Sequence, residues 1–345
     1  MPADQTNTGP GDAGAPVAPA ADTASGSAVA VDHEVGAGTE FRDRATAALA
    51  DVPRVPGSKK PDPILVADHV VRRFGGLTAV DVEHVEIQRN AITALIGPNG
   101  AGKTTLFNLL TGFDSPDEGA WTFDGEKFSK LAAHKVARKG MVRTFQLTKA
   151  LSRLTVIENM RLGSQKQRGE GIFAALFKPL WAGEEREITE RADDLLKRFK
   201  LDAKREDFAG SLSGGQRKLL EMARALMSKP QMVMLDEPMA GVNPALTQSL
   251  LGHVKDLREQ GMTVLFVEHD MDMVRDISDW VIVMAQGKIV AEGPPDSVMA
   301  DPAVIDAYLG GHHDASLDVA PLEEVDPGHH YTHEEPTGST EAEKA

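Results

Sequence analysis

The sequence predicts an α/β fold with a mostly parallel central sheet. Three short runs, at Ala91–Ile96, Met232–Leu235 and Thr263–Val267, are apolar almost throughout, as expected of strands buried on both faces. A helical stretch separates each run from the next, which favours parallel pairing because parallel strands need a crossover connection. We therefore expect these runs to lie at the centre of one sheet.

Further strands are expected on either side of these runs. Strand character occurs at Ile64–Arg73 and Asp81–Ile87, ahead of the central runs. Towards the other end of the chain, Trp280–Met284 and Lys288–Ala291 are joined across Gln286-Gly287. Two strand-like runs linked by a short turn with glycine predict a β-hairpin.

A helix is predicted at Glu187–Lys200 by the period of its apolar side chains. These occur at i, i+4, i+7, i+8 and i+11 and so share one face: Ile188, Ala192, Leu195, Leu196 and Phe199. Because the segment lies between two strand runs, we expect an α-helical subdomain inserted into the α/β core. The sequence shows no internal repeat, which excludes two such cores in tandem.

The two ends of the chain differ in composition from its middle. Met1–Lys60 is built mainly from Ala, Gly, Pro, Asp, Ser and Thr, and His312–Ala345 is rich in acidic residues. Such segments bury too little apolar surface to offset the entropy lost on ordering. We expect a disordered N-terminal extension at 1–60, a folded domain at 61–311 and a disordered acidic tail at 312–345.

The charge balance narrows the function. The chain of 345 residues has a net charge of −15, of which the first 60 residues carry −3 and the last 34 carry −8. A nearly neutral middle argues against a nucleic-acid or anionic-lipid surface, since either would need a basic excess. Cysteine is absent, which excludes disulfides and thiolate chemistry. No signal-like N-terminus or run of eighteen apolar residues occurs, so we expect neither export nor an unaided membrane span.

A phosphate-binding loop is the clearest motif. Residues 97–104 fit G-x-x-x-x-G-K-[ST] and lie between a predicted strand and the helical pattern of Leu106–Leu110, which is the context that this motif requires. The glycines let backbone N–H groups turn towards a β-phosphate, and the following helix adds its positive end. Lys103 would reach the β- and γ-phosphates, and the Thr104 hydroxyl would face Mg²⁺. The predicted nucleotide-binding residues are Gly97, Pro98, Asn99, Gly100, Ala101, Gly102, Lys103, Thr104 and Thr105.

Two adjacent carboxylates follow the strand run at Met232–Leu235. A strand that ends in Asp236 and Glu237 brings both acids to the sheet edge where the phosphates bind, on opposite sides of the strand. Asp236 would hold the magnesium shell, and Glu237 would orient the attacking water and remove its proton. By itself an Asp-Glu pair is equally typical of a turn or helix cap. Together with the phosphate loop, it indicates hydrolysis.

The segment Leu212-Ser213-Gly214-Gly215-Gln216, placed before a helix and then the carboxylate strand, resembles the signature motif of ABC ATPases. Other elements of that family follow in the same order: Phe74 at the adenine-stacking position, Gln146 at the lid glutamine and His269 at the switch histidine. The resemblance covers about Leu65 to Gly310. It implies a P-loop ABC ATPase core with an antiparallel β subdomain and an inserted helical subdomain at about 147–229.

The same resemblance implies a mechanism. In this family two ATPase domains pack head to tail, so that Mg-ATP on the phosphate loop of one meets the signature motif of the other, here Ser213, Gly214, Gly215 and Gln216. Ser213 and the helix after it would present a hydroxyl and a positive helix end to the γ-phosphate. His269 would contact the γ-phosphate beside Glu237. Gln146 would contact Mg²⁺ or the attacking water.

Local features narrow the resemblance further. The segments Val142–Gln146, Glu237–Pro244 and Ala307–Gly310 are similar to ATPase subunits of branched-chain amino acid importers. This subgroup implies integral-membrane permease partners, a second identical or similar ATPase subunit, and a peripheral location on the cytoplasmic face of the plasma membrane. The intact signature motif departs from many members of the subgroup. A urea or amide importer and a lipid-type exporter therefore stay open as alternatives.

Two other classes of function are weighed against transport. A non-transport ABC ATPase normally has a long coiled-coil insertion or two fused cores, and a nucleotide-dependent binding module would be expected to lose Lys103 or Glu237. Neither pattern is found. The apolar segment Gly171–Trp181 can be read as part of the core of the helical subdomain or as a docking site for the permease or the lipid interface.

Overall fold

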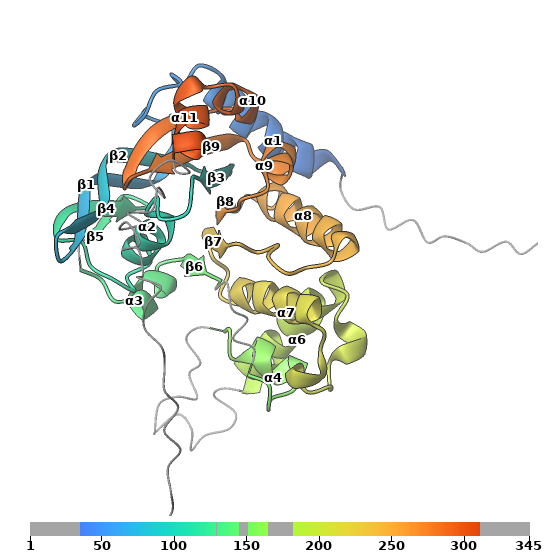
Figure 1. Cartoon of the computed structure of the whole chain (residues 1–345). Coiled ribbons are helices and arrows are strands. Elements are labelled where there is room, and N and C mark those ends of the chain that lie inside the picture. Colours follow the sequence, from blue (N-terminus) through green and yellow to red (C-terminus); the bar gives the residue numbers. More distant parts are fainter. Residues whose placement is uncertain (1–34, 129, 145–150, 165–181, 311–345) are drawn as a thin grey trace, which may run out of the picture. The chain divides into compact units, whose positions relative to one another are not determined.

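The computed structural model describes residues 35–128, 130–144, 151–164 and 182–310 (Figure 1). From Gly36 onward the chain forms a single unit, which holds all of the strands. The predicted segment Gly171–Trp181 and the predicted tail 312–345 lie outside the described residues. Within the described residues, no helix is long and apolar enough to cross a bilayer.

The larger sheet has six strands in the order β10-β9-β3-β8-β7-β6. Parallel pairs join β9, β3, β8, β7 and β6, and β10 is antiparallel to β9, which confirms both the parallel centre and the hairpin. Every residue of β3, β7 and β8 is buried, which explains why their sequences are apolar almost throughout. The strands are β3 (Ile92–Ile96), β6 (Met141–Arg143), β7 (Met232–Asp236), β8 (Thr263–Val267), β9 (Trp280–Ala285) and β10 (Lys288–Gly293).

The second sheet is antiparallel, with four strands in the order β2-β1-β4-β5. Its bounds are β1 (Pro63–Phe74), β2 (Leu77–Gln88), β4 (Glu118–Phe123) and β5 (Glu126–Phe128). The first two strands agree with the sequence prediction. The other two are short and only half buried, and they are anchored by the buried side chains of Trp121, Phe123 and Phe128. Their apolar pattern is too brief to predict a strand.

The remaining elements are helices. They are α1 (Val35–Ala50), α2 (Lys103–Leu110), α3 (Ala133–Arg138), α4 (Val156–Arg161), α6 (Ala182–Arg198), α7 (Gly214–Leu226), α8 (Pro244–Glu259), α9 (Met271–Ile277), α10 (Pro295–Met299) and α11 (Pro302–Gly310), with 3-10 turns at Asp202–Lys204 and Ala209–Ser211. Of these, α1 precedes the first strand, α10 and α11 follow the last, and the others lie between strands.

The predicted apolar face of α6 is present. Ala192, Leu196 and Phe199 are fully buried and Leu195 is nearly so, in a cluster shared with α4 and α7. The helix begins five residues earlier than predicted and ends two residues earlier. Three helices therefore pack against one another within the part of the chain predicted to be a helical subdomain.

Residues 35–60 differ from the expected disordered extension. Helix α1 buries Ala45 and Leu49, and Val52 is buried directly after it. Phe41 packs close to Gly261, since its ring lies 3.4 Å from the position that a Cβ on that glycine would take. Phe41, Ala45 and Leu49 are spaced i, i+4, i+8, which is an amphipathic helical pattern. The prediction missed it because it was based on the overall composition of the first sixty residues.

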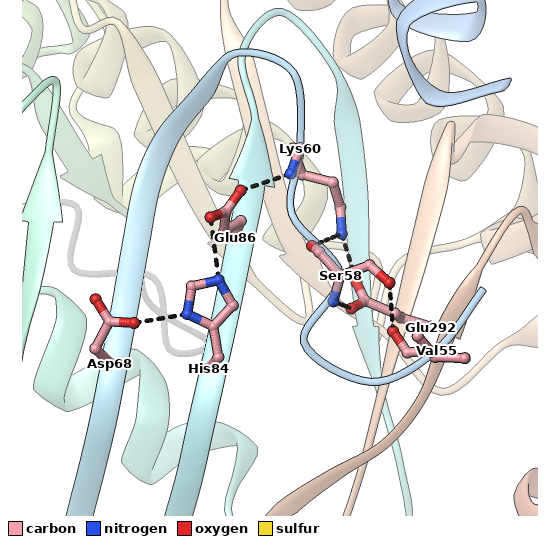
Figure 2. A network of polar contacts seen from close by, with 7 residues as sticks. All are labelled: Val55, Ser58, Lys60, Asp68, His84, Glu86 and Glu292. Atoms are coloured by element: carbon pink, nitrogen blue, oxygen red, sulfur yellow. Dashed lines mark hydrogen bonds and ion pairs between the residues drawn. The ribbon is translucent and has the colours of Figure 1, made fainter. Parts of the chain in front are cut away.

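The segment after α1 is held by a buried ion pair (Figure 2). Lys60 Nζ lies 2.8 Å from Glu292 Oε2, and both side chains are at most 1% exposed. The same carboxylate accepts hydrogen bonds from the Ser58 amide at 2.6 Å and from Trp280 Nε1 at 2.9 Å. The Lys60 amide donates to Glu86 of β2 at 2.6 Å. Residues 58–60 are therefore tied to both sheets.

Candidate active site

The phosphate loop connects β3 to α2 and requires glycine at two positions. Gly97 and Gly102 have φ angles of 148° and 99°, which favour glycine. A Cβ on Gly97 would lie 2.1 Å from the Met284 carbonyl oxygen of β9, and one on Gly102 would lie 2.4 Å from the Ala79 carbonyl oxygen of β2. The Gly287 amide also donates to Ala101. The loop thus rests on the β9–β10 hairpin and on β2.

Lys103 is the first residue of α2 and its amine turns back over the loop. Nζ donates to the carbonyl oxygens of Gly97 at 2.7 Å and Pro98 at 2.9 Å. Burial lowers the pKa of Lys103, while the charges of Glu237 and Asp236 act in the opposite direction. The amine, the helix N-terminus and both carboxylates therefore share one electrostatic environment. Asn99, Gly100 and Thr104 are exposed, and Thr105 is half-buried.

Asp236 ends β7 and is neutralised by an arginine from the neighbouring strand. Arg143 of β6 donates to Asp236 Oδ2 at 2.5 Å, and both side chains are at most 7% exposed. Arg143 also donates to Asn108 of α2 at 2.6 Å. The sequence segment containing Arg143 was noted for its resemblance, but no role was predicted for this residue. The parallel register of β6 with β7, which brings the two side chains together, is not visible in the sequence.

Glu237 and His269 lie together at the ends of adjacent strands. His269 Nε2 is 2.8 Å from Glu237 Oε1. Glu237 adopts a φ of 46°, a left-handed conformation that is uncommon for a residue with a side chain. Its amide donates to the Val267 carbonyl oxygen of β8 at 3.1 Å, which fixes the turn against that strand. The structure thus places the predicted base beside the predicted switch histidine.

The predicted signature motif forms the start of α7. Ser213 is the N-cap, and its hydroxyl accepts from the Gln216 amide at 3.3 Å while the Gln216 side chain accepts from the Ser213 amide at 3.0 Å. This reciprocal pair is a capping box, which satisfies helix N–H groups. Ser213 and Gly214 are exposed, whereas Gly215 faces Leu246 of α8 so closely that a Cβ would require the leucine side chain to shift. The motif presents an exposed hydroxyl and a helix end.

Two other predicted residues have different outcomes. Phe74 ends β1 with 49% of its surface exposed, and the Arg72 guanidinium lies 4.7 Å from its ring centroid. An exposed aromatic face suits stacking on a base. Gln146 lies outside the described residues, so its predicted contacts with the water and with Mg²⁺ stay predictions.

Glu268 is a buried acid that the sequence analysis did not single out. It is 6% exposed, and its Oε1 accepts from the Met239 amide at 2.9 Å. Burial raises its pKa, and the two backbone amides that it accepts from partly oppose this. A signal was available, since Glu268 directly follows the apolar strand β8 just as Glu237 directly follows β7.

The donor set suits a nucleotide with a divalent cation. Thr104 offers an exposed hydroxyl beside the phosphate loop, and the buried carboxylate of Asp236 ends β7, which is separated from β3 by β8. Hydroxyl and carboxylate oxygens are the ligands that Mg²⁺ prefers in proteins.

Comparison with known proteins supports the same interpretation. The family model described as "ABC transporter" matches residues 81–240, and one described as "Branched-chain amino acid ATP-binding cassette transporter" matches residues 288–314. The high-affinity branched-chain amino acid transport ATP-binding protein BraF of Pseudomonas aeruginosa is 43% identical over 250 residues, which cover 72% of this chain and 98% of the relative. The chain belongs to the ABC transporter family. This ABC ATPase couples ATP hydrolysis to transport.

Other relatives agree with this family assignment. The probable branched-chain amino acid transport ATP-binding protein LivG of Archaeoglobus fulgidus is 40% identical over 247 residues, covering 72% of this ABC ATPase and 95% of the relative. A solved ATP-binding cassette of an ABC transporter in its ADP conformation is 38% identical with a TM-score of 0.63, covering 72% and 99% of the two chains. A nucleotide-free cassette has a TM-score of 0.62 at the same identity, covering 71% and 98%. The predicted fold class is therefore confirmed.

Proposed function

We propose that this chain is the ATP-hydrolysing subunit of an importer for branched-chain amino acids. Two observations support the cargo: the family model that matches residues 288–314, and the names of relatives about 40% identical to the chain. The chemistry rests on one structural observation. Lys103, Asp236 and the contact between Glu237 and His269 lie at the same edge of the sheet.

The chain's own residues divide the hydrolytic work. The phosphate loop and Lys103 bind the β- and γ-phosphates, and Phe74 stacks on the adenine. Thr104 and Asp236 would hold Mg²⁺, which would neutralise phosphate charge when bound. Glu237 orients the attacking water and accepts its proton, and His269 holds the Glu237 carboxylate in place. Gln146 senses the state of the site from the lid position.

The assembly that we propose has two ATPase subunits arranged head to tail. Ser213, Gly214, Gly215 and Gln216 of one subunit then complete the site on the phosphate loop of the other. The exposure of Ser213 and Gly214 supports this, because the Ser213 hydroxyl and the start of α7 are free to meet a second molecule's phosphates. The dimer acts on integral-membrane permease subunits from the cytoplasmic face of the plasma membrane, without nucleic acid.

Transport assays in the native host test the cargo. Replacing the gene with a Glu237→Gln allele should abolish energy-dependent uptake of radiolabelled leucine, isoleucine and valine, while uptake of an unrelated amino acid such as lysine continues. Urea uptake and export of a lipid are measured in the same strains. If leucine uptake persists and urea uptake is lost, the cargo proposal is wrong although the ATPase assignment stands.

A further inference from the structure

The turn that carries Glu237 adopts an uncommon backbone conformation. Glu237 has a φ of 46°, and the chain folds back immediately, with the Ala240 amide donating to the Glu237 carbonyl oxygen at 3.2 Å. A non-glycine residue in the left-handed region is sterically disfavoured, so it persists only where its surroundings hold it. The residues that hold this turn therefore control the position of the proposed base.

One side of the turn is held by Lys218 of α7. Its Nζ atom donates to three carbonyl oxygens: Glu237 at 3.3 Å, Pro238 at 3.0 Å and Ala240 at 2.5 Å. Three backbone carbonyls around one ammonium use all of its donors. Burial lowers the pKa of Lys218, whereas nearby carboxylates favour its charged form: Glu268, Glu221 and Glu237.

The backbone amides of the turn, in contrast to its carbonyl oxygens, are bound at the end of β8. Glu268 Oε1 accepts the Met239 amide at 2.9 Å, and the Glu237 amide donates to Val267. The attachment to β8 stays within the central sheet. Lys218 differs, because it connects the turn to a helix that packs with α4 and α6.

Lys218 lies on the same helix as the signature serine. Ser213 is the N-cap of α7 and Lys218 follows five residues later, about 7.5 Å along the axis. A helix segment of this length moves as a rigid body, so a displacement of its N-terminus also displaces the Lys218 backbone. The contacts of Lys218 convert that displacement into a change at the Glu237 turn.

We propose that Lys218 is a positioning residue that couples the two ATP sites of the dimer. When Ser213 engages the ATP bound to the other subunit, the start of α7 is fixed, and Lys218 then sets the Glu237 turn in its own subunit. This inference rests on the head-to-tail dimer of the proposed function. Within a single chain, Lys218 then links the signature motif to the proposed base.

The test compares Lys218→Met with the unmodified full-length protein. Methionine keeps the apolar stem and removes the three donors. We expect kcat to fall roughly 10- to 100-fold, as for loss of hydrogen bonds to a charged group, and the Hill coefficient for ATP to fall to one. The Kd for a fluorescent ATP analogue should change less than about twofold, because the phosphate loop is intact. Lys218→Arg should restore part of kcat and of the cooperativity.

Controls separate coupling from folding and from the dimer itself. Lys255→Met removes a half-buried lysine of α8 paired with Asp276 and should leave kcat, Hill coefficient and melting temperature unchanged. A Glu237→Gln variant should form an ATP-dependent dimer on size-exclusion chromatography, and adding Lys218→Met should not prevent it. Failure of Glu237→Gln to dimerise would refute a dimer made of two copies of this chain, together with the coupling between their sites. Dimerisation with full kcat, or with undiminished cooperativity, in Lys218→Met refutes the coupling alone.

Discussion

His269 Nε2 lies 2.8 Å from Glu237 Oε1, across the ends of two parallel strands. Strands β7 and β8 pair in register, with Asp236 opposite Val267, so residues just beyond both strands meet at one edge of the sheet. The imidazole restrains a carboxylate on a left-handed turn, and this restraint keeps the carboxylate at the edge where the phosphate loop lies.

Glu237→Gln should separate ATP binding from turnover. The amide keeps the size of the side chain but cannot accept a proton, so we expect kcat to fall roughly 100- to 1000-fold. Phosphate release measures this effect, and binding of a fluorescent ATP analogue should be retained. The matched control is Glu259→Gln at the exposed end of α8. Turnover near that of the unmodified protein would mean that another group is the base.

Lys103→Ala should weaken ATP binding itself. The amine lies over the phosphate loop. In the proposed role it would contact the ground-state phosphates as well as the transition state, so its loss should raise the Kd by at least about tenfold. Isothermal titration with ATP and Mg²⁺ measures the change. Lys127→Ala, at an exposed position of β5, should bind ATP normally. Equal affinities in the two variants would contradict the assigned role of Lys103.

Lys60→Met should destabilise the fold. Removing one partner of a buried ion pair leaves Glu292 with two neutral donors and no counter-charge, and we expect the free energy of unfolding to fall by roughly 3 kcal/mol. Urea denaturation measures it. Lys59→Met changes the exposed neighbouring lysine and should cost little. If both variants unfold at the same urea concentration, the ion pair does not stabilise the domain.

His253 should make stability depend on pH. Its ring packs 4.4 Å from that of Phe199, neither nitrogen has a hydrogen-bond partner among the described residues, and burial lowers its pKa. The unfolded state then takes up a proton first, so stability is full above about pH 6.5 and declines as the pH falls towards the folded-state pKa.

The variant His253→Phe keeps an aromatic ring without a titrating group. Between pH 7.5 and 5.5 it should lose less of its free energy of unfolding than the unmodified protein, with a difference of at most about 1.4 kcal/mol per pH unit. Exposed His134→Phe serves as the control. The interpretation would be falsified if the two variants showed the same pH dependence.

The sequence was sufficient to predict features that depend on local pattern. The apolar run at Thr263–Val267 coincides with β8, and Gly97 and Gly102 of the phosphate loop occupy positions where a Cβ would collide with backbone carbonyl oxygens. The short strands β4 and β5 were missed because half-buried strands of three to six residues carry too little periodicity. Helix α1 was missed because its apolar spacing was averaged with that of its neighbours.

Contacts between distant segments were beyond the reach of the sequence. The pairing of Arg143 with Asp236 follows from the register of β6 with β7. The hydrogen bonds from Lys218 to the Glu237 turn follow from the packing of α7. Neither Lys218 nor Arg143 belongs to a sequence pattern that would indicate its partner. By contrast, Glu268 could have been found, because it repeats the strand-then-acid pattern of Glu237.

The carboxylate of Glu292 also bears on how the chain can be shortened. A fragment that starts at residue 61 lacks Ser58 and Lys60, so a charged group in β10 would face the indole of Trp280 alone. The β9–β10 hairpin, to which Glu292 belongs, packs directly against the phosphate loop. Trimming the N-terminus to the predicted boundary should therefore loosen nucleotide binding at a distance, although every motif of the active site would remain in the fragment.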